Sequence, residues 1–173
     1  IIMLEPRRLA ARATAERLAQ QLGETTGQTV GYRMRGDNKP GTRIEVVTEG
    51  ILTRMIQSDP ELSGIGAVIF DEFHERSLNA DFGLALTWEI AKALRDDLYI
   101  VVMSATLDAG PVAAMLNDAP VITSEGRAFP VTTHHLAKPL PKTMRLPEAT
   151  AELITKAAAE TTGGILVFLP GEG

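Results

Sequence analysis

The sequence predicts an α/β fold in which a parallel sheet is covered by helices on both faces. Strand patterns alternate with helix patterns along the chain, and the run at 67–70 is wholly apolar, as expected of a strand buried on both sides. Strands that alternate with helices of this length imply right-handed βαβ units. Two carboxylates, Asp71 and Glu72, follow the apolar run directly.

The elements expected before residue 67 are a strand (1–4), a helix (9–22), a turn (37–42), a strand (43–47) and a short helix (50–57). In the first helix, Ala11, Ala15, Leu18 and Leu22 lie on one stripe, and Gly23 is a suitable stop. We expect this stripe to face the sheet.

The elements expected next are a strand (67–70), a long helix (79–94), a strand (99–103), a helix to about residue 116 and a strand (121–123). The long helix carries Phe82, Leu86, Ile90 and Ala93 on one face. Asp108 is a candidate cap for the helix that follows it, which has a proline near its first turn.

The composition changes at residues 126–141, which contain three prolines, two adjacent histidines and no helical period. We expect a domain junction there, with a strand at 131–136. A helix from Pro147 with Ala149, Leu153 and Ala157 on its inner face should follow, and then a strand at 165–169. The chain begins within a strand, without Met, and stops just after another, so we expect an internal fragment of a longer protein.

Composition excludes some classes of protein. The net charge of −5 argues against coating nucleic acid through overall positive charge, although a local basic strip remains compatible. The absence of cysteine excludes disulfides and thiolate chemistry. No apolar run approaches the roughly 18 residues of a membrane span, and no signal peptide is evident. We expect a soluble, cytoplasmic protein.

Polar side chains follow four of the predicted strands. If the sheet is parallel, all four strand ends meet on the side where open α/β sheets bind ligands. The segments that follow the strands are Glu5-Pro6-Arg7-Arg8, Thr48-Glu49-Gly50, Asp71-Glu72 and Ser104-Ala105-Thr106. Polar residues are also common in ordinary turns, so the grouping indicates a site more strongly than any one segment does.

These segments divide by their chemistry. An Asp at a strand end can hold Mg²⁺ on a nucleotide phosphate, and an adjacent Glu can polarise an attacking water. Arg7 and Arg8 carry permanent charge, whereas Thr48 and Gly50 offer a hydroxyl and a backbone N–H at a helix start, as in contacts to a nucleic-acid backbone. Arg12 would extend this strip.

Plainer interpretations stay open for each feature. The carboxylates also fit a solvated acidic turn, and Arg8 and Arg12 fit a solvated helix face offset by Glu16. Ser104 and Thr106 fit simple capping around the next helix.

The residues resemble the superfamily 2 helicases of the DEAH/RHA branch, in motif order and spacing along essentially the whole chain. Asp71-Glu72-Phe73-His74 resembles motif II, with Phe73 in place of the usual Ala. The other matching segments are Glu5 to Ala11 (motif Ia), Thr48 to Leu52 (Ib), Ser104 to Thr106 (III), Gly126 to Val131 (the approach to a second domain) and Ile165 to Gly171 (IV). The sequence Glu75-Arg76-Ser77 after motif II makes the bacterial HrpB-type ATP-dependent helicases the most similar group.

The resemblance implies two RecA-like domains and specific roles. Residues 1–125 would form a first RecA-like domain without its phosphate-loop segment, 126–141 a junction with the strand that leads onward, and 142–173 the start of a second RecA-like domain. Asp71 would bind Mg²⁺ through water, Glu72 would be the general base, and His74 with Ser104 and Thr106 would couple nucleotide state to nucleic-acid binding. The residues implied along the nucleic-acid backbone are Pro6, Arg7, Arg8, Thr48, Glu49 and Gly50.

The implied cofactors are ATP and Mg²⁺, and the implied partner is nucleic acid, single-stranded RNA rather than DNA. Arg33 and Arg35 lie in a segment that also resembles the family, with a less definite role. The loop G-x-x-x-x-G-K-[ST] is absent from the sequence. We therefore expect a parent protein that translocates on or unwinds nucleic acid, and no catalysis by these 173 residues alone.

Two other functions fit parts of the pattern. A RecA-like NTPase that remodels proteins would show no stimulation by RNA or DNA. A degenerate module that only binds nucleic acid would need neither Asp71 nor Glu72, and both are present. A metal hydrolase built on His74, His134 and His135 fails on ligand spacing, since the adjacent pair is expected to flank a strand.

Overall fold

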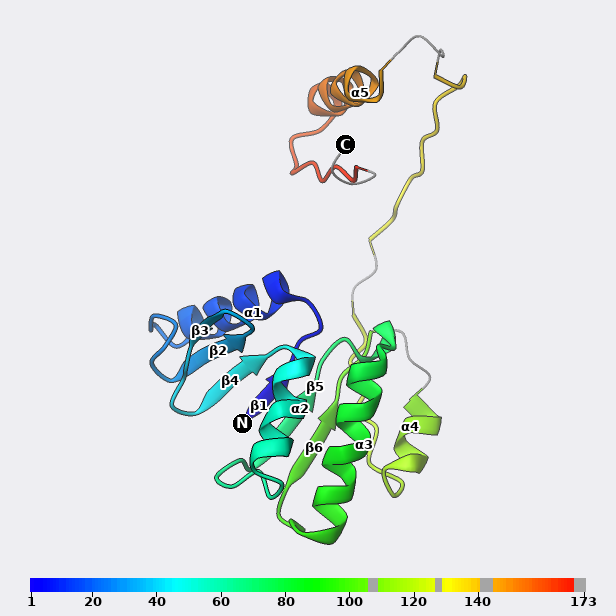
Figure 1. The fold of residues 1–173 in the computed structure, drawn as a ribbon. Helices are drawn as coiled ribbons and strands as arrows, with labels where there is room; N and C mark the ends of the chain where they lie inside the picture. Colours follow the sequence, from blue (N-terminus) through cyan, green and yellow to red (C-terminus); the bar gives the residue numbers. More distant parts are fainter. Residues whose placement is uncertain (106–108, 127–128, 141–144, 170–173) are drawn as a thin grey trace. The chain divides into compact units, whose positions relative to one another are not determined.

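The computed structural model describes residues 1–105, 109–126, 129–140 and 145–169. The chain divides into two compact units, Ile1–Thr123 and Ser124–Gly173. Among the described residues, every strand belongs to the first unit, which holds the sheet shown in Figure 1. No helix in the described ranges combines the length and apolar character needed to cross a bilayer.

The sheet of the first unit has six strands in the order β3-β2-β4-β1-β5-β6. Their bounds are β1 (Ile2–Leu4), β2 (Val30–Met34), β3 (Asp37–Lys39), β4 (Ile44–Val47), β5 (Ala67–Phe70) and β6 (Tyr99–Val102). All neighbouring pairs are parallel except β2 and β3, which are antiparallel. The prediction of a wholly parallel sheet is therefore wrong at one edge.

The antiparallel edge follows from a hairpin that the sequence prediction misplaced. Only Arg35 and Gly36 separate β2 from β3, and a two-residue connection can join only antiparallel strands. Gly36 has φ +79°, as tight hairpin turns require. The predicted turn at 37–42 thus begins inside a strand.

The helices of the first unit flank the sheet. Their bounds are α1 (Arg8–Gln21), α2 (Glu49–Ser58), a 3₁₀ turn η1 (Phe73–Glu75), α3 (Leu78–Ala93) and α4 (Ala109–Met115). Figure 1 shows α1 on one side of the sheet and α2 and α3 on the other. The strands predicted at 1–4, 43–47, 67–70 and 99–103 and the helices predicted between them are confirmed. The cap proposed at Asp108 lies outside the described residues.

Alternation along the strands divides the interior into two cores. Ile2, Leu4 and Phe70 point toward α2 and α3, whereas Val30 and Val46 pack beneath α1. Each of these side chains is at most 4% exposed, which stabilises the fold by roughly 1.5–3 kcal/mol per residue. The cores fix the strands, and hence the loops that leave them.

The predicted inner faces of the two long helices are confirmed at Ala11, Ala15 and Ile90 and wrong near the helix ends. In α1 the buried residues are all alanine, Ala11, Ala15 and Ala19, while Leu22 is 55% exposed. In α3 the buried residues include Gly83 and Thr87, and the predicted inward Phe82 is 51% exposed. The small side chains of α1 let it lie close to the sheet, whereas α3 also buries Leu84 and Ile90.

The sheet is not covered completely. Ile100 and Val102 of β6 pack against the α3 side, but Tyr99 and Val101 on its other face are 74% and 42% exposed. In the described part of the chain, α1 covers β2 and β4 and does not extend over β6. The expectation of two fully covered faces is thus wrong at this edge strand.

The second unit contains α5 (Leu146–Glu160). Of its predicted inner face, Ala149 is buried but Leu153 is 45% exposed. The strands predicted at 131–136 and 165–169, and the one at 121–123 in the first unit, do not form among the described residues. A strand needs a hydrogen-bonded neighbour, and the described residues offer these segments none.

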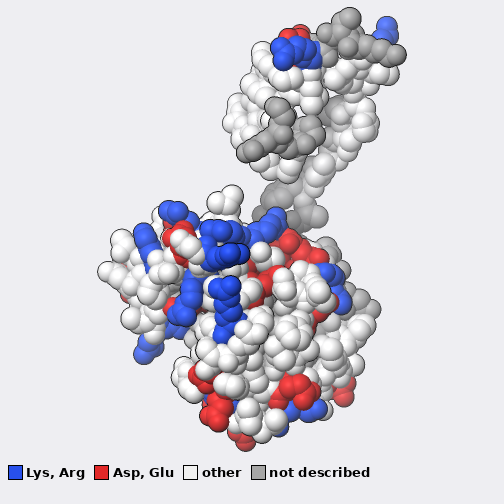
Figure 2. All heavy atoms as spheres, viewed as in Figure 1, with Lys and Arg blue, Asp and Glu red and all other residues white. Residues whose placement is uncertain are grey.

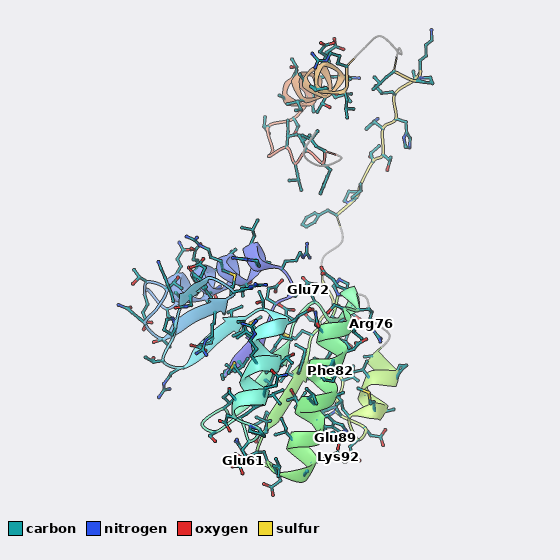
Figure 3. The ribbon with its side chains drawn as sticks, in the orientation of Figure 1. Glu61, Glu72, Arg76, Phe82, Glu89 and Lys92 are labelled. Carbon is teal, nitrogen blue, oxygen red and sulfur yellow. The ribbon has the colours of Figure 1, made fainter. Side chains whose placement is uncertain are left out.

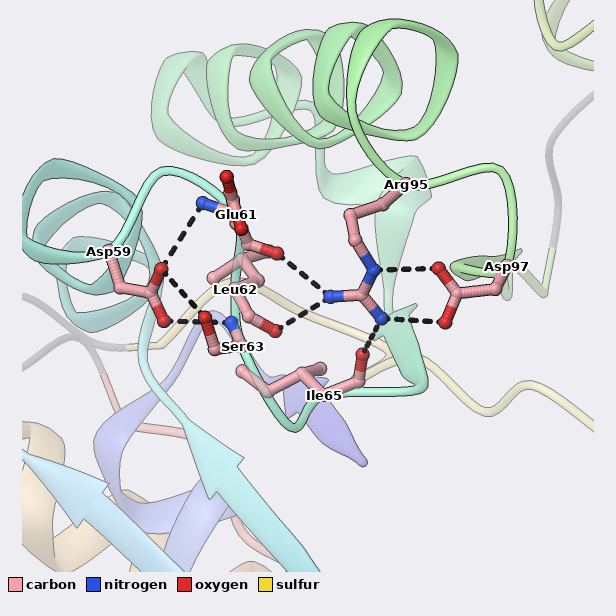
Figure 4. Close-up of polar contacts among 7 residues, drawn as sticks. All are labelled: Asp59, Glu61, Leu62, Ser63, Ile65, Arg95 and Asp97. Carbon is pink, nitrogen blue, oxygen red and sulfur yellow. Dashed lines mark hydrogen bonds and ion pairs between the residues drawn. The ribbon is translucent and has the colours of Figure 1, made fainter.

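A single arginine ties α3 to the loop between α2 and β5 (Figure 4). The Arg95 guanidinium donates to the carbonyl oxygens of Glu61, Leu62 and Ile65 at 2.8–3.1 Å, and also to the Asp97 carboxylate. This ion pair lowers the pKa of the Asp97 carboxyl. The planar fork of donors satisfies three loop carbonyls at once.

We predict that Arg95→Lys lowers the thermal unfolding midpoint by several degrees, because an ammonium group cannot reproduce the fork and leaves loop carbonyls unpaired. Circular dichroism against temperature measures this. Arg17→Lys, on an exposed position of α1, is the matched control. Equal midpoints for the two variants would contradict the assignment.

Candidate functional site at the carboxyl end of the sheet

Four strands are followed by polar loops that lie at the same end of the sheet. Leu4 lies in register with Val47 on one side and Phe70 on the other. The backbone pairing continues beyond the strands, because the Glu5 N–H donates to Val47 and the Asp71 N–H to Leu4, each at 3.0 Å. The predicted convergence of these strand ends is confirmed.

The two carboxylates leave β5 in different backbone conformations. Asp71 Oδ1 accepts a hydrogen bond from the Glu72 N–H at 2.8 Å. Glu72 has φ +51°, in the left-handed region that costs a non-glycine residue roughly 1–2 kcal/mol. Both side chains are half-buried. Figure 3 shows Glu72 and Arg76 together at this end of the sheet, far from Glu61.

His74 links the carboxylates to the end of β6. Its Nε2 lies 3.4 Å from the Glu72 carboxylate, and its Nδ1 accepts from the Ala105 N–H at 3.5 Å. The Phe73 N–H donates to the Met103 carbonyl at 3.1 Å. Ser104 follows β6 and is exposed, while Thr106 lies outside the described residues. The structure thus joins His74 to the predicted coupling segment through its backbone.

A third carboxylate, Glu5, lies beneath this pair and is only 3% exposed. Burial, together with the charges of Asp71 and Glu72, raises the pKa of Glu5 to about 7. A carboxyl in such surroundings holds its proton into the neutral range. Sequence reasoning passed over Glu5, because nothing in a strand-end pattern shows which acidic residue points inward.

The basic side of the site comes from the loop after β1. Pro6 is half-buried, and Arg7 and Arg8 are exposed where α1 begins. Arg7 forms an ion pair with Glu75. Arg12, on the next turn, pairs with Glu16 at 2.8 Å, which matches the solvated helix face considered as an alternative.

The start of α2 borders a shallow depression of about 220 Å³, lined by Arg35, Thr48, Gly50, Ile51 and Arg54. The Thr48 side chain forms no cap hydrogen bond with α2. Two arginines from different elements therefore flank the predicted contacts Thr48 and Gly50.

Arg54 was missed from the sequence, although a signal existed. Gly50 and Arg54 are four residues apart on one helix, so they share a face. Arg33 has a structural role instead, since its guanidinium donates twice to the Glu45 carboxylate, at 2.8 and 3.0 Å, and Glu45 is only 8% exposed.

Positive charge gathers on this side of the first unit. Figure 2 shows Lys and Arg side chains over α1, the adjoining strands and α2, with Asp and Glu more frequent toward the lower end in this view. The chain as a whole is acidic, so the basic strip is local, as the sequence allowed.

The described residues contain no group of three or more His, Cys, Asp or Glu arranged to hold a metal ion. This suits Mg²⁺ in a phosphoryl-transfer site, which is held by one or two carboxylates together with water and substrate phosphate. The carboxylate of Asp71 at the end of β5 fits that mode.

The chain matches the DEAD/DEAH box helicase family model over residues 1–114. It is 57% identical over 175 residues to the ATP-dependent RNA helicase HrpB of Escherichia coli (strain K12), covering 100% of this chain and 21% of that protein. It is 36% identical over 173 residues to the ATP-dependent RNA helicase HrpA of the same organism, covering 97% and 13%. The crystal structure of Escherichia coli DEAH/RHA helicase HrpB is similar with a TM-score of 0.86 and 57% identity, covering 99% and 22%. The chain thus spans less than a quarter of each relative.

We predict that Glu5→Gln stabilises the unit above pH 7 and not below about pH 4.5. Between these values the folded state keeps a proton that the unfolded chain has released, so the free energy of unfolding of the parent falls as pH rises. Glutamine stays neutral, and the gain should reach at most about 3 kcal/mol.

Urea unfolding in EDTA from pH 4 to 8 measures the gain, with Glu89→Gln on the exposed side of α3 as the charge control. A gain that does not change with pH would contradict the prediction.

Proposed function

The chain belongs to the DEAD/DEAH box helicase family, and we propose that the protein containing it is an ATP-dependent RNA helicase of the DEAH/RHA branch. The observation that carries this proposal is the convergence of the loops after β1, β4, β5 and β6, which brings a carboxylate pair and exposed arginines to one end of the sheet. The names of the relatives support RNA as the substrate.

On the nucleotide side, Asp71 would hold Mg²⁺ through water, and the ion would neutralise phosphate charge. Glu72 would accept a proton from the attacking water as general base. His74 would relay the state of this site to Ser104 and Thr106 on the loop after β6. Its contacts with Glu72 and with the Ala105 N–H support that relay.

On the nucleic-acid side, the residues proposed to lie along the nucleic-acid backbone are Pro6, Arg7, Arg8, Thr48, Glu49 and Gly50. Arg35 and Arg54 extend the set, because they line the depression with Thr48 and Gly50. Such contacts position a strand without reading its bases. Discrimination between RNA and DNA would require contacts to the 2′-hydroxyl.

We propose residues 1–125 as part of a first RecA-like domain, 126–141 as a junction and 142–173 as the start of a second such domain. Closure of two domains on ATP and reopening after hydrolysis would then move the protein along one strand.

An NTPase that remodels proteins is the main alternative. The basic residues around Thr48 favour the helicase, since a remodeller needs no phosphate-binding strip. ATP hydrolysis in the full-length protein, with and without single-stranded RNA or DNA of the same sequence at fixed salt, separates the two. An ATP hydrolysis rate that neither RNA nor DNA changes would favour the remodeller.

We predict that Glu72→Gln in the full-length protein lowers ATP turnover by about 10²–10⁴-fold, because the water loses its base. Binding of a fluorescent ATP analogue should remain. A protein that merely binds nucleic acid would be unaffected. As a control, the 173 residues alone should not hydrolyse ATP, since their sequence lacks the phosphate loop. Mg²⁺-dependent turnover by that chain would contradict this part of the proposal.

We also predict that Arg54→Ala weakens single-stranded RNA binding severalfold, to a similar extent for different sequences, because a phosphate contact is lost. The slope of log K against log salt should become shallower by about 0.7. Arg43→Ala is the matched control, as Arg43 precedes β4 whereas Thr48 follows it. Equal effects of both variants on the slope would show that only net charge matters.

A further inference from the structure

The turn that follows the carboxylate pair contacts the nucleic-acid side of the site at two points. The coupling turn, residues Glu72–Ser77, contains η1 and leads into α3. Glu75 accepts from the guanidinium of Arg7, and the Ser77 hydroxyl donates to the Glu49 carboxylate. Arg7 lies on the loop after β1, and Glu49 is the first residue of α2, which follows β4. They are 68 and 28 residues away from their partners in sequence.

The same turn is fixed internally. The Glu75 N–H donates to the Glu72 carbonyl at 2.9 Å, and the Arg76 N–H to the Phe73 carbonyl at 3.2 Å. Phe73 is 4% exposed and meets the Phe70 ring edge-on at 6.4 Å between centroids. The burial of Phe73 anchors the turn, and one hydrogen-bonded turn of backbone connects Glu75 to Glu72.

Strain at both ends makes this turn sensitive to its contacts. Glu72 and Arg76 each have φ +51°, a conformation that non-glycine residues adopt only when their surroundings hold them there. Arg76 is held by Asp81 at 3.1 Å and by the face of Phe73 at 5.6 Å. The ion pair of Glu75 with Arg7 connects this turn to the loop after β1.

The ion pair between Arg7 and Glu75 is suited to exchange. Their side chains are 66% and 33% exposed, and a pair in such contact with solvent changes an equilibrium by at most about fivefold. A phosphate group is a competing bidentate partner for the same guanidinium. A nucleic-acid strand that bound Arg7 would compete with Glu75 for the guanidinium.

We propose that Glu75 is a positioning residue that couples strand binding at Arg7 to the placement of Glu72. Without nucleic acid, the ion pair holds the coupling turn in a resting arrangement. When a phosphate takes Arg7, Glu75 is released and the turn moves Glu72 toward its working position. This inference rests on the proposed function, and adds to it the residue that senses the strand.

The test measures ATP turnover of the full-length protein against the concentration of single-stranded oligouridylate. Glu75→Gln should raise the rate without RNA about two- to fivefold, and lower the half-saturating RNA concentration by a similar factor, because Arg7 has lost its competitor. Glu16→Gln, which breaks the comparable exposed pair with Arg12, is the matched control and should change neither.

A second variant separates coupling from structural damage. In an Arg7→Ala background, Glu75→Gln should have no further effect on the rate without RNA, whereas damage to the turn would lower that rate whatever stands at position 7. Equal behaviour of Glu75→Gln and Glu16→Gln, or an unchanged effect in the Arg7→Ala background, would overturn the coupling role alone. If RNA does not change ATP turnover by the full-length protein, the proposed function is overturned as well.

Discussion

The direction of the strands is the constraint on which the site depends. In a parallel sheet every strand ends on the same side. Loops that are tens of residues apart in sequence therefore become neighbours because of strand pairing alone. Here Leu4 is in register with Val47 and with Phe70, so the loops after β1, β4 and β5 begin at the same level of the sheet. The two apolar cores hold the register, so the polar residues above them need not contribute to stability. Because burial raises the pKa of Glu5 to about 7, this carboxyl is only partly ionised at neutral pH and adds less repulsion to the acidic group.

The sequence predicted those strands whose side chains form the cores, because a short, unbroken apolar run between helices indicates a buried strand. It did not predict β2 or β3. Gly31 and Arg33 interrupt the apolar pattern of β2, and β3 is wholly polar, so backbone pairing across the turn at Arg35–Gly36 holds this edge. The predicted helix faces were correct for Ala11, Ala15 and Ile90 and wrong for Leu22 and Phe82, which are exposed.

The direction of the strands was sufficient to predict which loops meet at the site. The carboxylates, Arg7 and Thr48 follow from that rule. Contacts that depend on side-chain reach, such as Glu75 with Arg7 across 68 residues, leave no periodic signal in the sequence. Arg54 differs, since helical spacing from Gly50 was sufficient to find it. The roles of these residues in catalysis and strand binding remain proposals, whereas their shared location is a property of the fold.

The two edge strands of the sheet differ in a way that affects handling of the isolated chain. β3 is three residues long and carries Asp37 and Lys39, features that discourage another strand from pairing with it. Among the described strands, none pairs with the outer edge of β6, where Tyr99 and Val101 are also exposed. Such an edge can pair with a strand of another molecule, so self-association in concentrated samples should begin at β6. A charged residue in place of Val101 should then keep the chain monodisperse.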